Sequence, residues 1–121
     1  MAEHNDFGHQ GEVLAQNLLT QKGYKIIDTN WRYGHNEVDI IAQKDDIIVF
    51  VEVKTRSTTV FGEPESFVTR EKQKAYIRLA NHYIERYNRL EEVRFDIISI
   101  VINRYENEIK HIEGAFSAIM R

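Results

Sequence analysis

The sequence contains no cysteine and no long apolar run, and each absence excludes a class of protein. Without cysteine there is no disulfide and no thiolate metal site, so any metal must bind to oxygen or imidazole ligands. No apolar run approaches the roughly 20 residues that a membrane-spanning helix needs. Residues 1–6 also lack the basic and apolar regions of a signal peptide. We therefore expect a cytoplasmic protein with no membrane partner.

An excess of positive charge is missing as well, because 16 Lys and Arg stand against 19 Asp and Glu, a formal net charge of -3. Proteins that bind nucleic acid usually carry more Lys and Arg than acids, so the overall charge gives such a partner no support. Basic residues nevertheless gather between positions 54 and 78. This segment is either a local basic face or the solvated surface of a helix, and charge alone favours the solvated surface.

Hydrophobic periodicity predicts seven secondary-structure elements. At 121 residues the chain is most economically one domain, spanning 1–121. A helix, three strands, a second helix and two strands are expected in that order, at 7–22, 24–31, 37–42, 48–54, 70–88, 94–102 and 108–112. The order is typical of an α/β protein in which helices flank a mixed five-stranded sheet.

The ends of the two predicted helices carry capping residues. Asp6 and Thr69 are the expected N-caps, and Gly23 is the expected C-terminal stop of the first helix. Gly8 lies on the apolar side of that helix, where the missing Cβ would allow a close approach to another backbone. Residues 55–66 contain the single proline and no sustained period, which predicts a long functional or mobile loop.

Two neighbouring runs, at 37–42 and 48–54, are apolar and β-branched, yet both contain acidic residues. The segment between them is short and polar, which predicts a β-hairpin. If residues 45 and 46 form a two-residue turn, Lys44 faces Ile47 and the register of the whole hairpin is fixed.

In that register Asp39 lies directly opposite Glu52, with Cβ atoms roughly 5 Å apart. Lys54 follows Glu52 by two residues, so strand alternation places it on the same face. Two carboxylates this close repel each other, and burial adds to the cost of their charge. A divalent cation between them would explain their presence. Acidic residues in hairpins also pair with Lys or Arg, and this alternative stays open.

Carboxylate oxygens are the ligands that Mg²⁺ prefers, with Mn²⁺ as a substitute. The backbone carbonyl of Val53, between Glu52 and Lys54, is a further candidate ligand. Such a cation could activate a water as nucleophile and neutralise charge on a phosphoryl oxygen. Lys54 would orient or deprotonate that water, or stabilise the transition state. Tyr76 recurs with other tyrosines at helical spacing, which favours packing over contact with nucleic acid.

Segments outside the hairpin complete a specific combination, and all of them occur in order along most of the chain. They are Gly8-x-x-Gly11-Glu12-x-x-Ala15, Asn30-Trp31-Arg32, Glu37-Val38-Asp39-Ile40-Ile41-Ala42, Phe50-Val51-Glu52-Val53-Lys54-Thr55-Arg56, Phe61-Gly62-x-Pro64, Val68-Thr69-x-x-Lys72 and Arg94-Phe95-Asp96. In this combination the chain resembles the YraN family of small bacterial proteins, within the PD-(D/E)xK nuclease superfamily.

The resemblance implies a restriction-endonuclease-like core related to Holliday junction resolvases. It implies that Asp39 and Glu52 bind the metal, that Lys54 is catalytic and that Glu12 is an auxiliary acid. From the residues alone, Glu12 is equally well explained as a first-turn acid that complements the helix dipole. Further residues implied near the site, as contacts to the substrate, are Glu37, Arg56, Lys72 and Gln73.

The expected function is that of a Mg²⁺- or Mn²⁺-dependent endonuclease that hydrolyses DNA phosphodiester bonds at branched or otherwise structured sites. An enzyme that resolves junctions needs two active sites, which would make the protein a homodimer. The alternative is a module that binds nucleic acid or a partner and keeps the nuclease fold without cleavage. The acidic net charge favours the alternative, whereas the intact Asp39, Glu52 and Lys54 oppose it. A purely structural protein would explain none of the facing charges.

Overall fold

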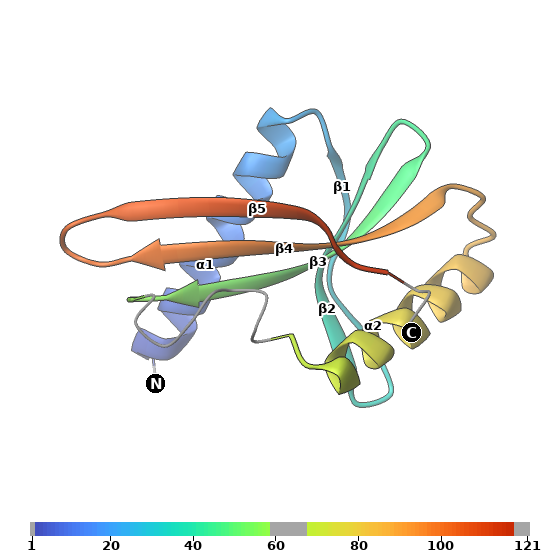
Figure 1. The fold of residues 1–121 in the computed structure, drawn as a ribbon, viewed down its shortest axis with the longest axis horizontal. Helices are drawn as coiled ribbons and strands as arrows, with labels where there is room; N and C mark the ends of the chain where they lie inside the picture. Colours follow the sequence, from blue (N-terminus) through green and yellow to red (C-terminus); the bar gives the residue numbers. More distant parts are fainter. Residues whose placement is uncertain (1, 59–67, 118–121) are drawn as a thin grey trace.

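The computed structural model describes residues 2–58 and 68–117, with residues 2–6 as backbone only (Figure 1). Within those ranges no helix is both long enough and apolar enough to cross a membrane. The elements are α1 (Ala2–Gln21), β1 (Lys25–Tyr33), β2 (Asn36–Lys44), β3 (Ile47–Arg56), α2 (Arg70–Arg86), β4 (Glu92–Ile102) and β5 (Asn107–Phe116). Most of the predicted loop at 55–66, including the matched segment Phe61–Pro64, lies outside the described residues.

The strands form one mixed sheet in the order β1-β2-β3-β4-β5. Strands β3 and β4 are parallel because α2 makes the crossover between them, and the other neighbours are antiparallel. The predicted α/β class with a mixed five-stranded sheet is therefore confirmed, and it is consistent with a restriction-endonuclease-like core.

The two helices cover opposite faces of this sheet (Figure 1). Alternation along β3 shows the division, since Val49 and Val51 pack in one apolar cluster with Ala15 and Leu19 of α1. Their neighbours Ile48 and Phe50 pack in a second cluster with four side chains of α2, Tyr76, Leu79, Ala80 and Tyr83. Side chains at even-numbered positions of β3 therefore face α2, and this sets the direction of Glu52.

The predicted hairpin register is confirmed between β2 and β3. Asp45 and Asp46 make the two-residue turn, with a positive φ of 54° at Asp45. Lys44 pairs with Ile47, and the ladder continues in the same register to the pair Ile40–Val51. The next pair would be residues 39 and 52, and the ladder of paired residues ends just before it.

The predicted start of α1 is wrong, because the helix begins at Ala2 and Asp6 lies inside it. Ala2 and Glu3 are good helix formers, which extends the helix beyond the polar residue expected to cap it. Gly23 does follow the helix as predicted, with a φ of 94°. At α2 the predicted cap is confirmed, since the Thr69 side chain accepts a hydrogen bond from the Lys72 N–H.

The close approach expected at Gly8 occurs instead at Gly11. A Cβ added at Gly11 would overlap Thr55 Oγ1 and lie 2.9 Å from Thr55 Cβ, whereas a Cβ at Gly8 would meet nothing within 4 Å. Gly11 therefore allows α1 to lie directly on the end of β3.

We expect Gly11→Ala to lower the free energy of unfolding by about 1–3 kcal/mol, the usual cost of overpacking. Gly8→Ala is a matched control on the same helix, and helix propensity predicts a gain of up to about 1 kcal/mol there. Chemical denaturation of both variants measures the difference. Equal stability of the two variants would contradict the close packing of α1 on Thr55.

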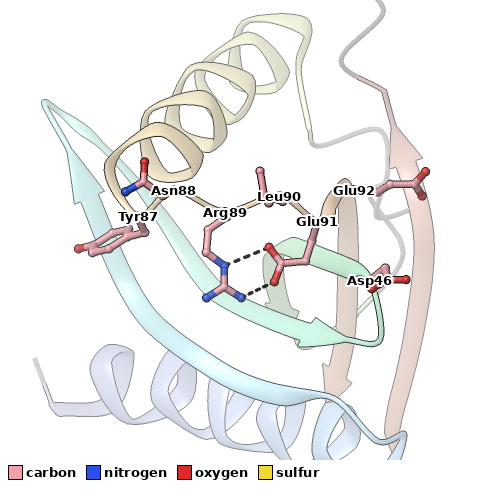
Figure 2. Close-up of a pocket in the computed structure, with 7 residues that line it drawn as sticks. All are labelled: Asp46, Tyr87, Asn88, Arg89, Leu90, Glu91 and Glu92. Atoms are coloured by element: carbon pink, nitrogen blue, oxygen red, sulfur yellow. Dashed lines mark hydrogen bonds and ion pairs between the residues drawn. The ribbon is translucent and has the colours of Figure 1, made fainter.

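The connection from α2 to β4 lines a pocket beside the hairpin turn (Figure 2). Arg89 donates two hydrogen bonds to the Glu91 carboxylate, at 3.1 and 2.8 Å, and one to the Gln43 side chain at 2.7 Å. The Glu92 N–H donates to the Asp46 carbonyl at 2.8 Å. These contacts join the turn to the start of β4, where the parallel pairing with β3 begins.

Candidate active site

The point where β2 and β3 diverge brings Asp39 and Glu52 together. Beyond the pair Ile40–Val51, the backbone N–H of Val53 donates to Oδ2 of Asp39 at 2.8 Å instead of to a carbonyl. Glu52 immediately precedes Val53 and is buried, with 7% of its surface exposed. An aspartate side chain thus takes the place of a backbone carbonyl at this point. We call the point where β2 and β3 diverge, beyond the pair Ile40–Val51, the fork of the hairpin.

Two cavities meet at this fork. The first has a volume of about 400 Å³ and is lined by His35, Asn36, Glu37, Asp39, Glu52, Val53, Lys54, Lys72, Ala75 and Tyr76. The second, of about 300 Å³, is lined by Phe7, Gly8, Glu12, Asp39, Val53, Lys54 and Thr55. Asp39, Val53 and Lys54 belong to both cavities. The structure therefore brings together Asp39, Glu52 and Lys54 in the first cavity. Glu12 lines the second cavity, which shares Asp39, Val53 and Lys54 with the first.

Both oxygens of the Glu52 carboxylate contact α2. The Tyr76 hydroxyl donates to Oε1 and the Lys72 ammonium donates to Oε2, each at 2.5 Å. Sequence reasoning placed Lys72 near the site but treated Tyr76 as helix packing. The two residues are four apart on one helix, so they share a face, and that spacing was the available indication that Tyr76 also reaches the site.

Asp39 is electrostatically unfavourable as an anion. Burial, followed by the charge of Glu52, raises the pKa of Asp39 to about 7; the Val53 N–H and the Lys72 charge lower it, and Glu12 raises it further. Burial and the charges of Glu52 and Asp39 also raise the pKa of Tyr76 well above its ordinary value. The fork thus concentrates negative charge that a bound cation would neutralise.

The donor set fits a hard dication that keeps most of its waters. Among the side chains that the structure describes, in residues 7–58 and 68–117, no three acidic or histidine side chains are grouped so that they could hold a metal ion. Asp39 and Glu52 are the two carboxylates predicted to bind the metal, and Mg²⁺ commonly takes only one or two. The N–H and C=O of a strand residue point to the same side, so the carbonyl of Val53 also faces the gap beside Asp39. The ligand roles of these three residues stay a prediction.

The other implied residues divide into two groups. Glu37 lines the first cavity and accepts a hydrogen bond from Arg32 at 3.1 Å. Gln73 and Arg56 line neither cavity. The Gln73 side chain donates instead to the Val68 carbonyl at 3.2 Å, at the start of α2. The substrate contacts implied for all three stay predictions.

A second buried carboxylate, Asp96, has no place in either cavity. It accepts two hydrogen bonds from Arg94 at 2.8 Å, one from the Gly114 N–H at 3.0 Å and one from His111 Nε2 at 2.8 Å. His111 Nδ1 lies 2.8 Å from the ammonium of Lys22, which follows α1. The acidic residue of the matched Arg94-Phe95-Asp96 segment is thus held in a network that joins β4 and β5 to α1.

Comparison with known proteins gives similarity over nearly the whole chain. A model of the uncharacterised protein family UPF0102 matches residues 11–100, which include Glu12 and both strands of the fork. A UPF0102 protein of Flavobacterium psychrophilum is 47% identical over 116 residues, covering 96% of this chain and 98% of the relative. UPF0102 proteins of Christiangramia forsetii and Bacteroides thetaiotaomicron are 46% and 45% identical, covering 96% of this chain and 98% and 96% of the relatives.

Proposed function

The chain belongs to the uncharacterised protein family UPF0102, the YraN family of the PD-(D/E)xK nuclease superfamily, and we propose that it is a metal-dependent endonuclease acting on DNA. The observation that carries the proposal is the meeting of Asp39, Glu52 and Lys54 where β2 and β3 diverge. Family membership supports a nuclease-like function, and the names of the relatives state no activity.

The carboxylates of Asp39 and Glu52 and the carbonyl of Val53 would hold Mg²⁺ or Mn²⁺. When bound, the cation supplies an acidified water and neutralises charge that develops on the phosphoryl group. Lys54 lines both cavities beside Asp39, where its ammonium would orient the attacking water and stabilise charge on a phosphoryl oxygen. Glu12, in the second cavity with Lys54, would hold that ammonium in place as an auxiliary acid.

Three basic residues follow one side of α2. Arg70, Lys74 and Arg78 succeed one another at intervals of four on α2, and all three are exposed. Residues four apart lie on one side of a helix. These three residues are two positions away from Lys72 and Tyr76, so their side of α2 is turned away from the first cavity. This arrangement favours the solvated surface of the helix over a basic face at the site, and DNA as the substrate is supported by membership of the nuclease superfamily. A branched substrate and a homodimer with two active sites extend the same proposal.

A module that binds nucleic acid without cleaving it is the second candidate. The observation that favours it is the engagement of both Glu52 oxygens by Lys72 and Tyr76, which leaves this carboxylate paired within the protein. A cation would have to compete with those contacts.

Cleavage assays with branched, single-stranded and duplex DNA in Mg²⁺ or Mn²⁺ test the proposal. We expect Glu52→Gln and Lys54→Met each to lower the rate by about 10²–10⁴, the usual loss when one catalytic or charge-stabilising group is removed. Glu108→Gln, at an exposed position of β5, is the matched control and should cleave at the wild-type rate.

Cleavage that survives both substitutions would remove the proposed site. Metal binding without cleavage of any of the three substrates would favour the binding module. Sedimentation analysis tests the extension to junctions, because a protein that stays monomeric with and without branched DNA would not have the two active sites.

A further inference from the structure

The two partners of Glu52 differ in how firmly the fold holds them. Tyr76 is 2% exposed and packs in the apolar cluster between α2 and the sheet. Its ring contacts Phe116 of β5 edge-to-face, with centroids 6.3 Å apart. Movement of the Tyr76 hydroxyl would require repacking of this core, so its hydrogen bond to Oε1 of Glu52 is a fixed contact.

The side chain of Lys72 is held at the site by the contact of its ammonium with Glu52. Its side chain is 43% exposed, whereas the side chain of Glu52 is 10% exposed. Lys72 occupies the first turn of α2, whose backbone is fixed by the hydrogen bond from the Lys72 N–H to Thr69. A four-carbon stem on a fixed backbone can move its ammonium through several ångströms by rotamer changes alone.

The positive charge of Lys72 also compensates the carboxylates that a metal ion is proposed to neutralise. Its ammonium lies 2.5 Å from Glu52 Oε2, so it offsets part of the negative charge at the fork. A single positive charge compensates two facing carboxylates less well than a dication would. Both ions would lie close to the same oxygens, where they would repel each other.

We infer that Lys72 is a displaceable counter-ion of Glu52, which leaves the carboxylate when a divalent cation binds, while Tyr76 stays and positions Glu52 for that cation. The inference rests on the proposed metal site and adds an order of events to it. The displaced ammonium remains at the mouth of the first cavity, where a phosphate oxygen of DNA is the anion that would next attract it. Metal binding would thereby prepare the site for its substrate.

Binding of Mn²⁺ to the metal-free protein, followed by calorimetry, tests the competition without relying on activity. We expect Lys72→Met, which keeps the length of the side chain but not its charge, to bind Mn²⁺ about tenfold more tightly than the wild type, or about 1.4 kcal/mol. Lys74→Met changes an exposed lysine of the same helix and should leave the affinity unchanged. Tyr76→Phe should weaken the affinity, since Glu52 loses its fixed contact.

Unchanged or weaker binding by Lys72→Met would overturn the displacement while leaving the metal site intact. Absence of Mn²⁺ binding by the wild type and by Lys72→Met would overturn the proposed function and this inference together. Wild-type affinity in Tyr76→Phe would remove the positioning role of Tyr76.

A second measurement uses the unaltered protein. Acetylation of lysines by a water-soluble ester, read by peptide mass spectrometry, reports how far each ammonium is engaged. We expect Mg²⁺ to raise the acetylation rate of Lys72 several-fold and to leave that of Lys74 unchanged. A rate at Lys72 that does not respond to Mg²⁺ would contradict its release.

Discussion

Asp39→Asn is expected to stabilise the metal-free protein above about pH 7, although Asp39 is central to the candidate site. Burial and the charge of Glu52 raise the pKa of Asp39 from 3.8 to about 7, so the ionised side chain opposes folding at neutral pH. Asparagine is neutral and of the same shape, and its oxygen can still accept the Val53 N–H. At about 1.4 kcal/mol per pKa unit, a shift of about three units gives an expected gain on the order of 4 kcal/mol.

The sign of the pH dependence follows from proton binding. Between the ordinary pKa of 3.8 and the raised pKa of about 7, the folded protein binds more protons at Asp39 than the unfolded chain does. The free energy of unfolding of the wild type should therefore fall as the pH rises through that window, and the Asn variant should lose most of this slope. Denaturant titrations at about pH 5 and pH 8 in the presence of a chelator measure it.

Asp46→Asn, at the exposed hairpin turn, is the matched control and should keep the wild-type slope. Added Mg²⁺ should restore stability to the wild type above about pH 7 far more than to Asp39→Asn, because binding to the ionised carboxylate stabilises the folded state. An Asn variant with the wild-type pH dependence would show that Asp39 is not strained as an anion.

Asp96→Asn is expected to have the opposite effect and to destabilise the protein by about 3–5 kcal/mol, the usual cost of breaking a buried ion pair. Burial by itself would raise the pKa of Asp96, but hydrogen bonds from His111, Arg94 and the Gly114 N–H lower it overall. Removal of the negative charge leaves Arg94 without its ion-pair partner. It also leaves an amide that cannot accept all the hydrogen bonds that the carboxylate accepts.

Because the pKa of Asp96 is lowered, its contribution to stability is present above the ordinary value of 3.8 and is lost as the pH falls through the lowered one. Wild type and Asp96→Asn should therefore differ at neutral pH and converge in acid. Thermal or denaturant unfolding of both proteins across this range tests the expectation, with Asp46→Asn again as the control. A variant as stable as the wild type at neutral pH would mean that the network contributes specificity of packing instead of stability.

Asp39 and Asp96 show why sequence reasoning located one of them better than the other. The position of Asp39 followed from a two-residue turn and strand alternation, both local rules, and they fixed the register from Lys44–Ile47 to Ile40–Val51. The environment of Asp96 depends on pairing between β4 and β5, which shifts register between Phe95 and Ile97. At this irregularity Asp96 forms hydrogen bonds with residues such as Gly114, which no local sequence pattern indicates.

The distinction between local interactions and contacts between distant segments also explains which other predictions were correct. The cap of α2 at Thr69 could be predicted because the interaction lies within four residues. The role of Tyr76 was missed because its partner Glu52 is 24 residues away. Its spacing of four from Lys72 was the one local indication that it reaches the site. Gly8 and Gly11 were indistinguishable by periodicity, and only the approach of Thr55 separates them.

The fork of the hairpin also places a spectroscopic probe inside the candidate site. The Val53 amide proton is hydrogen-bonded to a side-chain carboxylate, so its chemical shift depends on whether that carboxylate is protonated, ionised or bound to a cation. One backbone resonance would then follow proton release, metal binding and any exchange between these states. Most strand amides, bonded to carbonyl groups that do not titrate, would provide the internal reference.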